Sequence, residues 1–222
     1  MPRTARIILP DFAHHVTQRG IRKSDVFFSA GDRSLYLTLL HEQAFVHKIE
    51  VLAYCLMSNH VHHILVPKDT KSIALLFRHV HSRYSQIINK RYGWIGHLWQ
   101  NRFFSCPLEE NHLLCAIRYV ELNPVRAGVS LKAEDYPWSS AQSHVLNKVN
   151  PILIQSSSWL DFKSNITDNW SQWLLEGLTE EEISKLRTQT NRGLPCGSKD
   201  FSQKVEVITG KSFIKIRGRP RK

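Results

Sequence analysis

Two histidines separated by one residue, His60 and His62, form the sharpest chemical pattern in this sequence. Apolar alternation over residues 60–66 predicts a strand. Residues i and i+2 of a strand point to the same face, so both imidazoles could bind one metal ion while Val61 packs into the core. His63 points the opposite way, which predicts a structural role. The H-x-H pattern also arises by chance, so surface or core histidines remain the alternative.

Two imidazole ligands would leave a divalent ion with open coordination positions. Those positions could take a phosphate oxygen and orient it for attack, which are the Lewis-acid and template roles of a catalytic metal. Nitrogen and oxygen ligands with open positions suit Mg²⁺ or Mn²⁺ as well as Zn²⁺. The pattern therefore indicates a divalent metal without settling which one.

Tyr119 is the candidate nucleophile. It stands four residues before Asn123, so on the last turn of a predicted helix the two side chains would project to one side. A tyrosine can attack a phosphodiester and keep the DNA end as a phosphotyrosine. Asn123 could add an oxygen ligand to the metal. The alternative is a core aromatic followed by an ordinary residue at the helix C-terminus.

The charge of the chain is positive and unevenly distributed. The formal net charge is +11, made up of +7 over residues 1–149, −4 over residues 150–186 and +8 over residues 187–222. A basic body and a strongly basic tail indicate a polyanionic partner such as nucleic acid. A basic surface that serves only solubility is the alternative.

Other compositional features narrow the class of protein. Hydrophobic residues make up 42% of the chain, and no apolar run approaches the roughly 20 residues that span a bilayer. The N-terminal segment lacks the apolar core of a secretory leader. The four cysteines form no C-x-x-C pair that would indicate zinc. We therefore expect a cytoplasmic protein with no membrane partner.

The order of predicted elements points to one fold class. The segments are a strand over 14–19, a helix over 31–47, strands over 49–57 and 60–66, a helix from Ser72 to about 91, an extended aromatic stretch over 97–107 and a helix over 109–122. The turn at Ser58-Asn59 makes two strands antiparallel, whereas the other connections leave room for helical crossovers. This order predicts an α+β fold with a ferredoxin-like, split βαβ antiparallel sheet and helices on one face.

Four motifs carry a resemblance to a known family. Residues 54–62, YCLMSNHVH, resemble the HUH signature of single-tyrosine transposases. The likeness continues through residues 96–103 (GHLWQNRF), 118–128 (RYVELNPVRAG) and 135–140 (DYPWSS). Together these motifs, which cover about residues 3–145, resemble those of REP-associated tyrosine transposases (RAYTs), relatives of bacterial insertion-sequence transposases.

The resemblance implies roles for particular residues. His60 and His62 would be metal ligands, Tyr119 the nucleophile and Asn123 the third ligand, at a position where insertion-sequence enzymes usually have Gln. The implied substrates are REP hairpins with a short single-stranded foot, cleaved to a 5′-phosphotyrosine and a free 3′-OH. Insertion-sequence relatives are dimers with shared active sites, whereas RAYTs can act as monomers, and we expect a monomer here.

The chain is expected to divide into three parts. Residues 1–146 would form the catalytic domain, residues 147–178 a connector, and residues 179–222 a basic DNA-binding appendage with short helices near Thr179 and over 201–208. The sequence 217–220, RGRP, resembles an AT-hook core that enters an A·T-rich minor groove. A nonspecific phosphate-binding tail remains the alternative.

Basic and aromatic side chains are candidates for contacts with DNA. Trp94, Trp99 and Phe103 could stack on bases or serve as core residues. The candidate phosphate contacts are Arg3, Arg6, Arg19, Arg22, Lys23, Arg83, Arg102, Arg217 and Arg219.

The leading hypothesis is a metal-dependent DNA strand transferase that acts on hairpin-forming single-stranded DNA. One rival is a catalytically idle protein that uses the same fold to bind hairpins. A third possibility is a metal-dependent phosphodiesterase without a covalent intermediate. The H-x-H pair together with a suitably spaced tyrosine favours the first.

Overall fold

The computed structural model describes residues 6–154, 156–164, 166–167 and 169–213. The elements, in chain order, are β1 (His14–Arg19), a 3-10 turn η1 (Ile21–Lys23), α1 (Ala30–Val46), β2 (Ile49–Leu56), β3 (His60–Pro67), α2 (Ser72–Tyr92), β4 (Phe104–Pro107), α3 (Glu110–Glu121), α4 (Asn123–Arg126), a 3-10 turn η2 (Ala133–Asp135), α5 (Ala141–Val145), α6 (Ser157–Ser164), α7 (Trp170–Leu175), α8 (Glu180–Arg192) and α9 (Lys199–Thr209). None of the helices in the described residues is long and apolar enough to cross a membrane.

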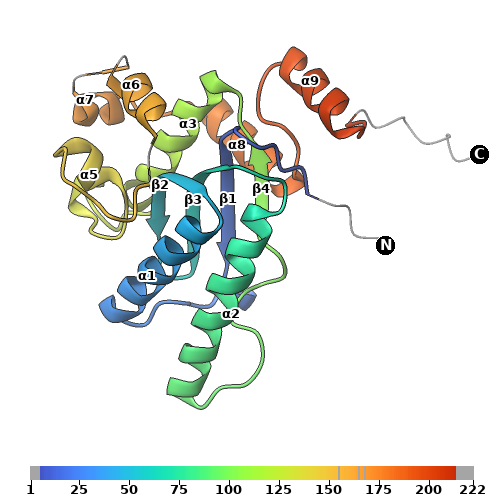
Figure 1. Cartoon of the computed structure of the whole chain (residues 1–222). Helices are drawn as coiled ribbons and strands as arrows, with labels where there is room; N and C mark the ends of the chain where they lie inside the picture. Colours follow the sequence, from blue (N-terminus) through green and yellow to red (C-terminus); the bar gives the residue numbers. More distant parts are fainter. Residues whose placement is uncertain (1–5, 155, 165, 168, 214–222) are drawn as a thin grey trace, which may run out of the picture.

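The four strands form one antiparallel sheet in the order β2-β3-β1-β4. β3 therefore lies between β2 and β1, and β1 lies between β3 and β4, as the split βαβ arrangement requires. Figure 1 shows this sheet at the centre of the molecule with helices around it. The predicted α+β, ferredoxin-like fold class is confirmed.

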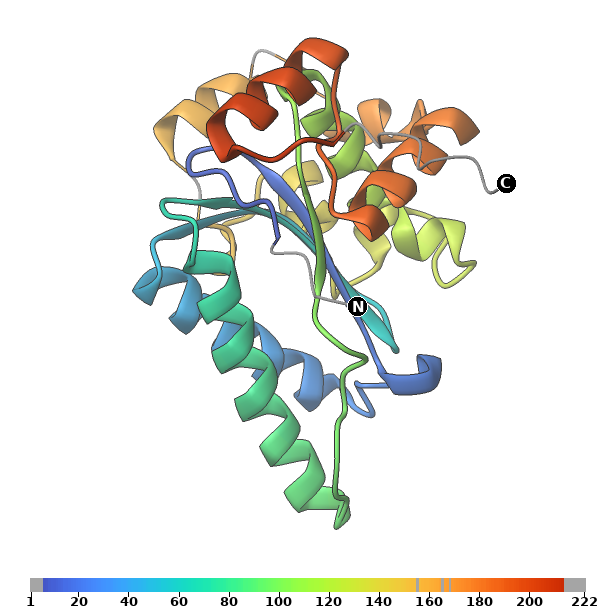
Figure 2. The ribbon, with the colours of Figure 1, turned by 90° about the vertical axis from the view of Figure 1, so that its right-hand side faces the viewer.

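Both faces of the sheet are covered, as Figure 2 shows with the sheet between two groups of helices. The two crossover helices, α1 and α2, pack on one face, where Val16 and Val61 are fully buried. α3 and α8 pack on the other face, where Ile64 and Cys106 are buried. The expectation of helices on one face thus holds for the crossover pair, and the face that carries His62 has its own helical cover.

Local sequence explains where the first two helices begin and end. Ser29 accepts a hydrogen bond from the N–H of Asp32, whose carboxylate accepts the N–H of Ser29 in return, which is a capping box at the start of α1. α2 begins at Ser72, as predicted, and the carboxylate of Asp69 accepts the N–H of Ser72. Gly93 ends α2 in the left-handed conformation that favours glycine.

The predicted connector contains two short helices, α6 and α7. Trp159, Trp170 and Trp173 from this segment are buried in the same hydrophobic cluster as residues of α3 and α8. Residues 147–178 are therefore packed onto the body of the protein at these tryptophans. Whether the three-part division of the chain is also a division of function stays a prediction.

Candidate active site

His60 and His62 lie side by side on β3. The register pairs His60 with Arg19 and His62 with Thr17 of β1. The two rings are 5.0 Å apart between centroids and nearly perpendicular. The predicted placement on one face is therefore what the strand geometry produces. His63 points to the opposite face, where it is fully buried against Phe77, as expected for a structural residue.

Each imidazole of the pair has its Nδ1 in a hydrogen bond. His60 Nδ1 donates to the side-chain oxygen of Asn59 at 2.6 Å, and His62 Nδ1 lies 2.9 Å from Nε2 of His15. His15 Nδ1 in turn lies 2.8 Å from the hydroxyl of Thr190. These bonds leave Nε2 of both histidines as the nitrogen able to ligate a metal, because ligating histidines commonly hold their other ring nitrogen in a hydrogen bond.

The surroundings keep both imidazoles neutral. Burial, followed by repulsion from Arg19, lowers the pKa of His60 to about 4. Burial also holds the pKa of His62 well below its usual value, and the neighbouring His15 and His60 lower it further. Neutral imidazole is the form that binds a metal ion. The histidine pair therefore has the protonation state that binding of a divalent metal requires.

Tyr119 projects from α3 toward the histidines. Its ring packs edge-on against His62 and His15, at centroid distances of 5.6 and 5.7 Å, and the residue is 5% exposed. The guanidinium of Arg126 lies 4.1 Å from the ring centroid and donates to the backbone oxygen of Tyr119 at 2.8 Å. Arg187 donates from Nε to the Tyr119 hydroxyl at 3.1 Å. The phenol is thus held between imidazoles and guanidinium groups.

Asn123 does not continue the helix of Tyr119. α3 ends at Glu121, and Asn123 opens the separate short helix α4, in which Pro124 follows it. Asn123 is buried. Over the described residues no cluster of three or more His, Cys, Asp or Glu side chains could hold a metal. A role for Asn123 as a third ligand stays a prediction.

Three residues of the site were missed from the sequence. His15 lies on β1, the strand next to β3, so the predicted sheet order could have indicated its place on the face of His62. Arg187 and Thr190 come from α8, and Thr190 is buried with its hydroxyl also 3.2 Å from the sulfur of Cys106. No local pattern could have shown that α8 packs against Tyr119, which is 68 residues away.

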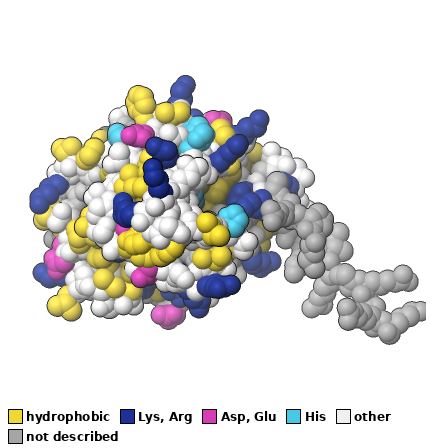
Figure 3. Space-filling view, turned by 90° about the horizontal axis from the view of Figure 1, so that it is seen from below, with side chains coloured by type: hydrophobic (Ala, Val, Ile, Leu, Met, Phe, Trp, Pro, Cys, Tyr) yellow, Lys and Arg dark blue, Asp and Glu magenta, His cyan; other side chains and the backbone are white. Residues whose placement is uncertain are grey.

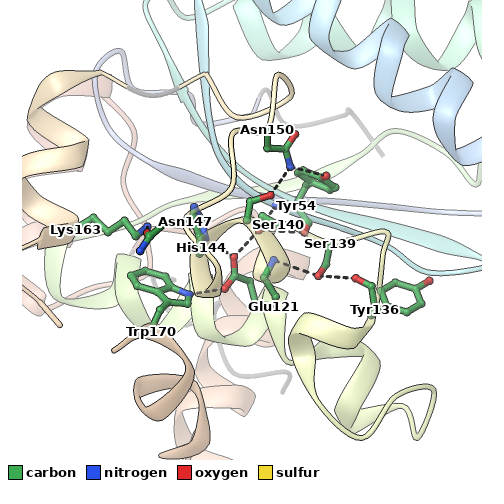
Figure 4. Close-up of polar contacts among 12 residues, drawn as sticks. Tyr54, Glu121, Tyr136, Ser139, Ser140, His144, Asn147, Asn150, Lys163 and Trp170 are labelled. Carbon is green, nitrogen blue, oxygen red and sulfur yellow. Dashed lines mark hydrogen bonds and ion pairs between the residues drawn. The ribbon is translucent and has the colours of Figure 1, made fainter. Parts of the chain in front are cut away.

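Glu121, the last residue of α3, lies at the centre of a polar network (Figure 4). Its fully buried carboxylate accepts hydrogen bonds from Ser140 at 2.5 Å, from His144 at 2.6 Å and from the indole of Trp170 at 2.8 Å. These partners belong to the segment after the helix and to α7. The network ties the helix that carries Tyr119 to the later part of the chain.

A groove of about 1220 Å³ runs beside the edge strand β4. Arg6 and Arg102, both candidate DNA contacts, line it, together with Arg192 and Lys211 from the later part of the chain. Thr190 also lines the groove, so the groove reaches the residue that is hydrogen-bonded to His15. The basic lining of the groove suits a negatively charged strand.

The remaining basic candidates are spread over several elements. Arg19, Arg22, Lys23 and Arg83 are exposed. Arg22 and Lys23 both adopt positive φ, and the backbone oxygen of Lys23 accepts a hydrogen bond from Asn59, the partner of His60. Figure 3 shows one face of the molecule on which Lys and Arg side chains are interspersed with few acidic ones. Arg3, Arg217 and Arg219 lie outside the described residues.

The aromatic candidates divide between surface and core. Trp94 is 46% exposed and stacks on Tyr92 with centroids 4.8 Å apart, so it lies at the surface. Trp99 and Phe103 are buried in the hydrophobic cluster beneath α1 and α2. Two of the three aromatics are therefore core residues.

The chain was compared with known proteins and with solved structures. A search of curated proteins finds no match. Among solved structures, a REP-associated tyrosine transposase bound to a REP hairpin matches with a TM-score of 0.57 and 17% identity, over 71% of this chain and 93% of that one. A candidate transposase from Deinococcus radiodurans matches with a TM-score of 0.38 and 17% identity, over 58% of this chain and 92% of that one.

The family-level match covers the part of the chain that builds most of the site. The model of the family described as "Transposase IS200 like" matches residues 10–123, slightly more than half of the chain. This span includes β1, β3 and α3, which supply His15, the histidine pair and Tyr119. The chain therefore belongs to the IS200-like transposase family.

Proposed function

We propose that this protein cleaves and rejoins hairpin-forming single-stranded DNA, with Tyr119 as the nucleophile and His60 and His62 as ligands of a divalent metal. The observation that carries the proposal is the packing of Tyr119 against His62, at 5.6 Å between ring centroids, from an element far along the chain. A phenol, two neutral imidazoles and a guanidinium group gathered at one place are suited to phosphodiester transfer.

The proposed cleavage step transfers the phosphate from O3′ of the DNA to the hydroxyl oxygen of Tyr119. The Tyr119 hydroxyl oxygen forms a bond to phosphorus, and the bond from phosphorus to O3′ breaks with its electron pair remaining on O3′. The phenol loses its proton and O3′ gains one, which yields a 5′-phosphotyrosine and a free 3′-OH. The phosphotyrosine keeps the energy of the phosphodiester, so attack by a 3′-OH rejoins the strand without a nucleotide cofactor. Bound Mg²⁺ or Mn²⁺ would supply Lewis-acid polarisation of the phosphate.

The structural match and the groove both support a hairpin DNA with a single-stranded segment as the substrate. The RAYT that shares this fold is bound to a REP hairpin, which supports a REP-like hairpin as the substrate here. We assign the groove with Arg6 and Arg102 to the single-stranded segment, because its guanidinium groups can pair with backbone phosphates. Arg19, beside His60, is suited to the phosphate nearest the metal.

The protein would act as a monomer. Tyr119 packs against His62 of the same chain, so one chain brings the nucleophile and the metal-ligating pair together. Asn123, buried at the start of α4 and four residues after Tyr119, would provide the third protein ligand.

The decisive experiment looks for the covalent intermediate. The protein is incubated with Mn²⁺ and a labelled hairpin DNA that has a 5′ single-stranded extension, then denatured and resolved by size. We expect a DNA-linked protein species in the parent and none in Tyr119→Phe, which removes only the phenolic oxygen. An adduct in the Phe variant would assign the nucleophile to another residue.

Two other results would replace the proposal. Tight hairpin binding without cleavage would identify an idle DNA-binding protein, which is the alternative within the same fold. Cleavage without any DNA-linked species would identify a metal-dependent phosphodiesterase. Omitting the metal and adding a chelator tests the metal requirement in the same assay.

A further inference from the structure

Helix α8 reaches the candidate active site from outside the part of the chain that the family match covers. The match ends at residue 123, whereas α8 spans Glu180–Arg192. Family membership therefore assigns no role to this helix. Its side chains nevertheless contact Tyr119, the proposed nucleophile, and His15, which is hydrogen-bonded to His62.

The first contact is made by Arg187. Its Nε lies 3.1 Å from the Tyr119 hydroxyl oxygen, and its guanidinium carbon lies 5.7 Å from the ring centroid. A guanidinium group has donors only, so the phenolic oxygen must accept this hydrogen bond. The bond fixes the position of the oxygen that would attack, and it leaves the Nη groups of Arg187 able to bind a phosphate oxygen.

The second contact holds the helix in place. Thr190, one helical turn after Arg187 and on the same side, is 1% exposed and is hydrogen-bonded to His15. His15 is hydrogen-bonded to His62, so α8 is joined to the metal-ligating pair through one intervening imidazole. Ile183 and Leu186 bury the adjoining face of α8 in the cluster that contains Ile117 of α3. The approach of Arg187 to Tyr119 is thus set by buried contacts.

We propose that Arg187 is a positioning residue of the active centre, which aligns the Tyr119 hydroxyl and stabilises the negative charge that develops during phosphodiester transfer. This inference rests on the proposed function. When the bond from the tyrosine oxygen to phosphorus forms and the O3′ bond breaks, charge passes over the phenolic and phosphoryl oxygens. A guanidinium group already in contact with the phenolic oxygen needs no rearrangement to stabilise that charge.

The test compares Arg187→Ala, Arg187→Lys and the parent in single-turnover adduct formation at saturating hairpin DNA with Mn²⁺. Lys185→Ala is the matched control, because it removes one positive charge from the same helix at a residue that faces His112 instead of the site. We expect the rate for Arg187→Ala to fall roughly 100-fold, at the lower end of the loss seen when one charge-stabilising donor is removed. Lys185→Ala should stay within about twofold of the parent.

Chemical rescue separates positioning from a merely structural role. Millimolar guanidinium should restore part of the Arg187→Ala rate and leave Lys185→Ala unchanged, whereas Arg187→Lys should stay slow because an ammonium group does not reproduce the planar donor. Melting curves check that the variants are folded, and Arg187→Gln replaces Arg187→Ala should the latter unfold.

The outcomes distinguish this inference from the function on which it rests. A parent that forms the adduct while Arg187→Ala forms it at the same rate overturns the role of Arg187 alone. A faster Arg187→Ala also overturns it, since the contact would then restrain the nucleophile. A parent that forms no adduct, or an adduct that survives Tyr119→Phe, overturns the proposed function and this inference together.

Discussion

Replacing Glu121 by Gln is the most direct test of what holds the helix of Tyr119 in place. The buried carboxylate accepts hydrogen bonds from Ser140, His144 and Trp170. Gln has the same shape as Glu, but its amide replaces one acceptor oxygen with an NH2 donor. At least one of the three buried donors therefore loses its partner, and the remaining hydrogen bonds are no longer made to a charged group. We expect Glu121→Gln to fold but to be markedly less stable.

The expected loss in the free energy of unfolding follows from the number and kind of hydrogen bonds that Glu121 accepts. A hydrogen bond to a charged group contributes about 1.5–3 kcal/mol, so losing one bond and weakening two should cost about 3 kcal/mol. For a chain of this size, each kcal/mol shifts the melting temperature by about 2–4 °C, which predicts a decrease of about 6–12 °C. Glu110→Gln, an exposed substitution on the same helix, should change the melting temperature by less than about 2 °C.

The effect should also depend on pH. Burial alone would raise the pKa of Glu121, but the contacts with His144, Ser140 and Trp170 outweigh it and lower the pKa below its usual value. A carboxyl group whose pKa is lower in the folded state contributes stability above its unfolded pKa of about 4.3 and loses it as the pH falls through the folded value. The difference between parent and Glu121→Gln should therefore be largest near pH 7 and shrink below about pH 4.

Thermal unfolding followed by circular dichroism, at pH 7 and at about pH 3, measures both effects. An equal melting temperature for parent and Glu121→Gln at pH 7 would show that the network contributes little. A decrease of the same size at both pH values would show that the carboxylate charge is not what stabilises the end of α3. Either result would refute the reasoning from these three contacts.

Three further predictions concern the histidines and the basic tail. His60 and His62 replaced together by Ala should lose metal-dependent cleavage, and cleavage equal to the parent at matched Mn²⁺ would exclude them as ligands. His63→Ala should instead lower the free energy of unfolding by about 2 kcal/mol or more, measured with denaturant, because it empties a buried site beside Phe77. Deleting residues 214–222 removes five positive charges and no negative ones. Each lost phosphate contact should flatten the slope of log affinity against log salt by about 0.7 on single strands. The cleavage rate at saturating DNA should not change, and a collapse of that rate would place the tail in the active centre.

Much of the fold could be predicted because its patterns are local. Alternation over residues 14–19 and 60–66 predicts β1 and β3 to within one residue, and the helical periodicity from Ser72 gives α2 with an end one residue beyond the expected one. The aromatic stretch over residues 97–107 was less informative. Only Phe104–Pro107 forms a strand, because Trp99 and Phe103 bury their rings in the core and the stretch lacks alternation.

The sequence was least informative where distant segments meet. Serines around residues 156–158 indicated a connector, yet three of the six tryptophans of the chain follow within residues 159–173 and are buried. That concentration of tryptophan was the available signal for packed structure. The end of the Tyr119 helix before Asn123 could be predicted, because Pro124 disfavours helical geometry at the residue before it. The start of a new helix at Asn123 could not, because it depends on tertiary packing.

The placement of α8 has a physical reason that also bears on function. The sheet face under α3 carries His15 and His62, and buried imidazoles need hydrogen-bond partners that an apolar helix could not supply. Thr190 supplies one to His15, and His15 supplies one to His62. A helix that satisfies these groups must lie close to the metal-ligating pair, and one turn earlier along it Arg187 meets the hydroxyl of Tyr119. The same contacts that close the polar face of the sheet thus bring a cation from the C-terminal part of the chain to the proposed nucleophile.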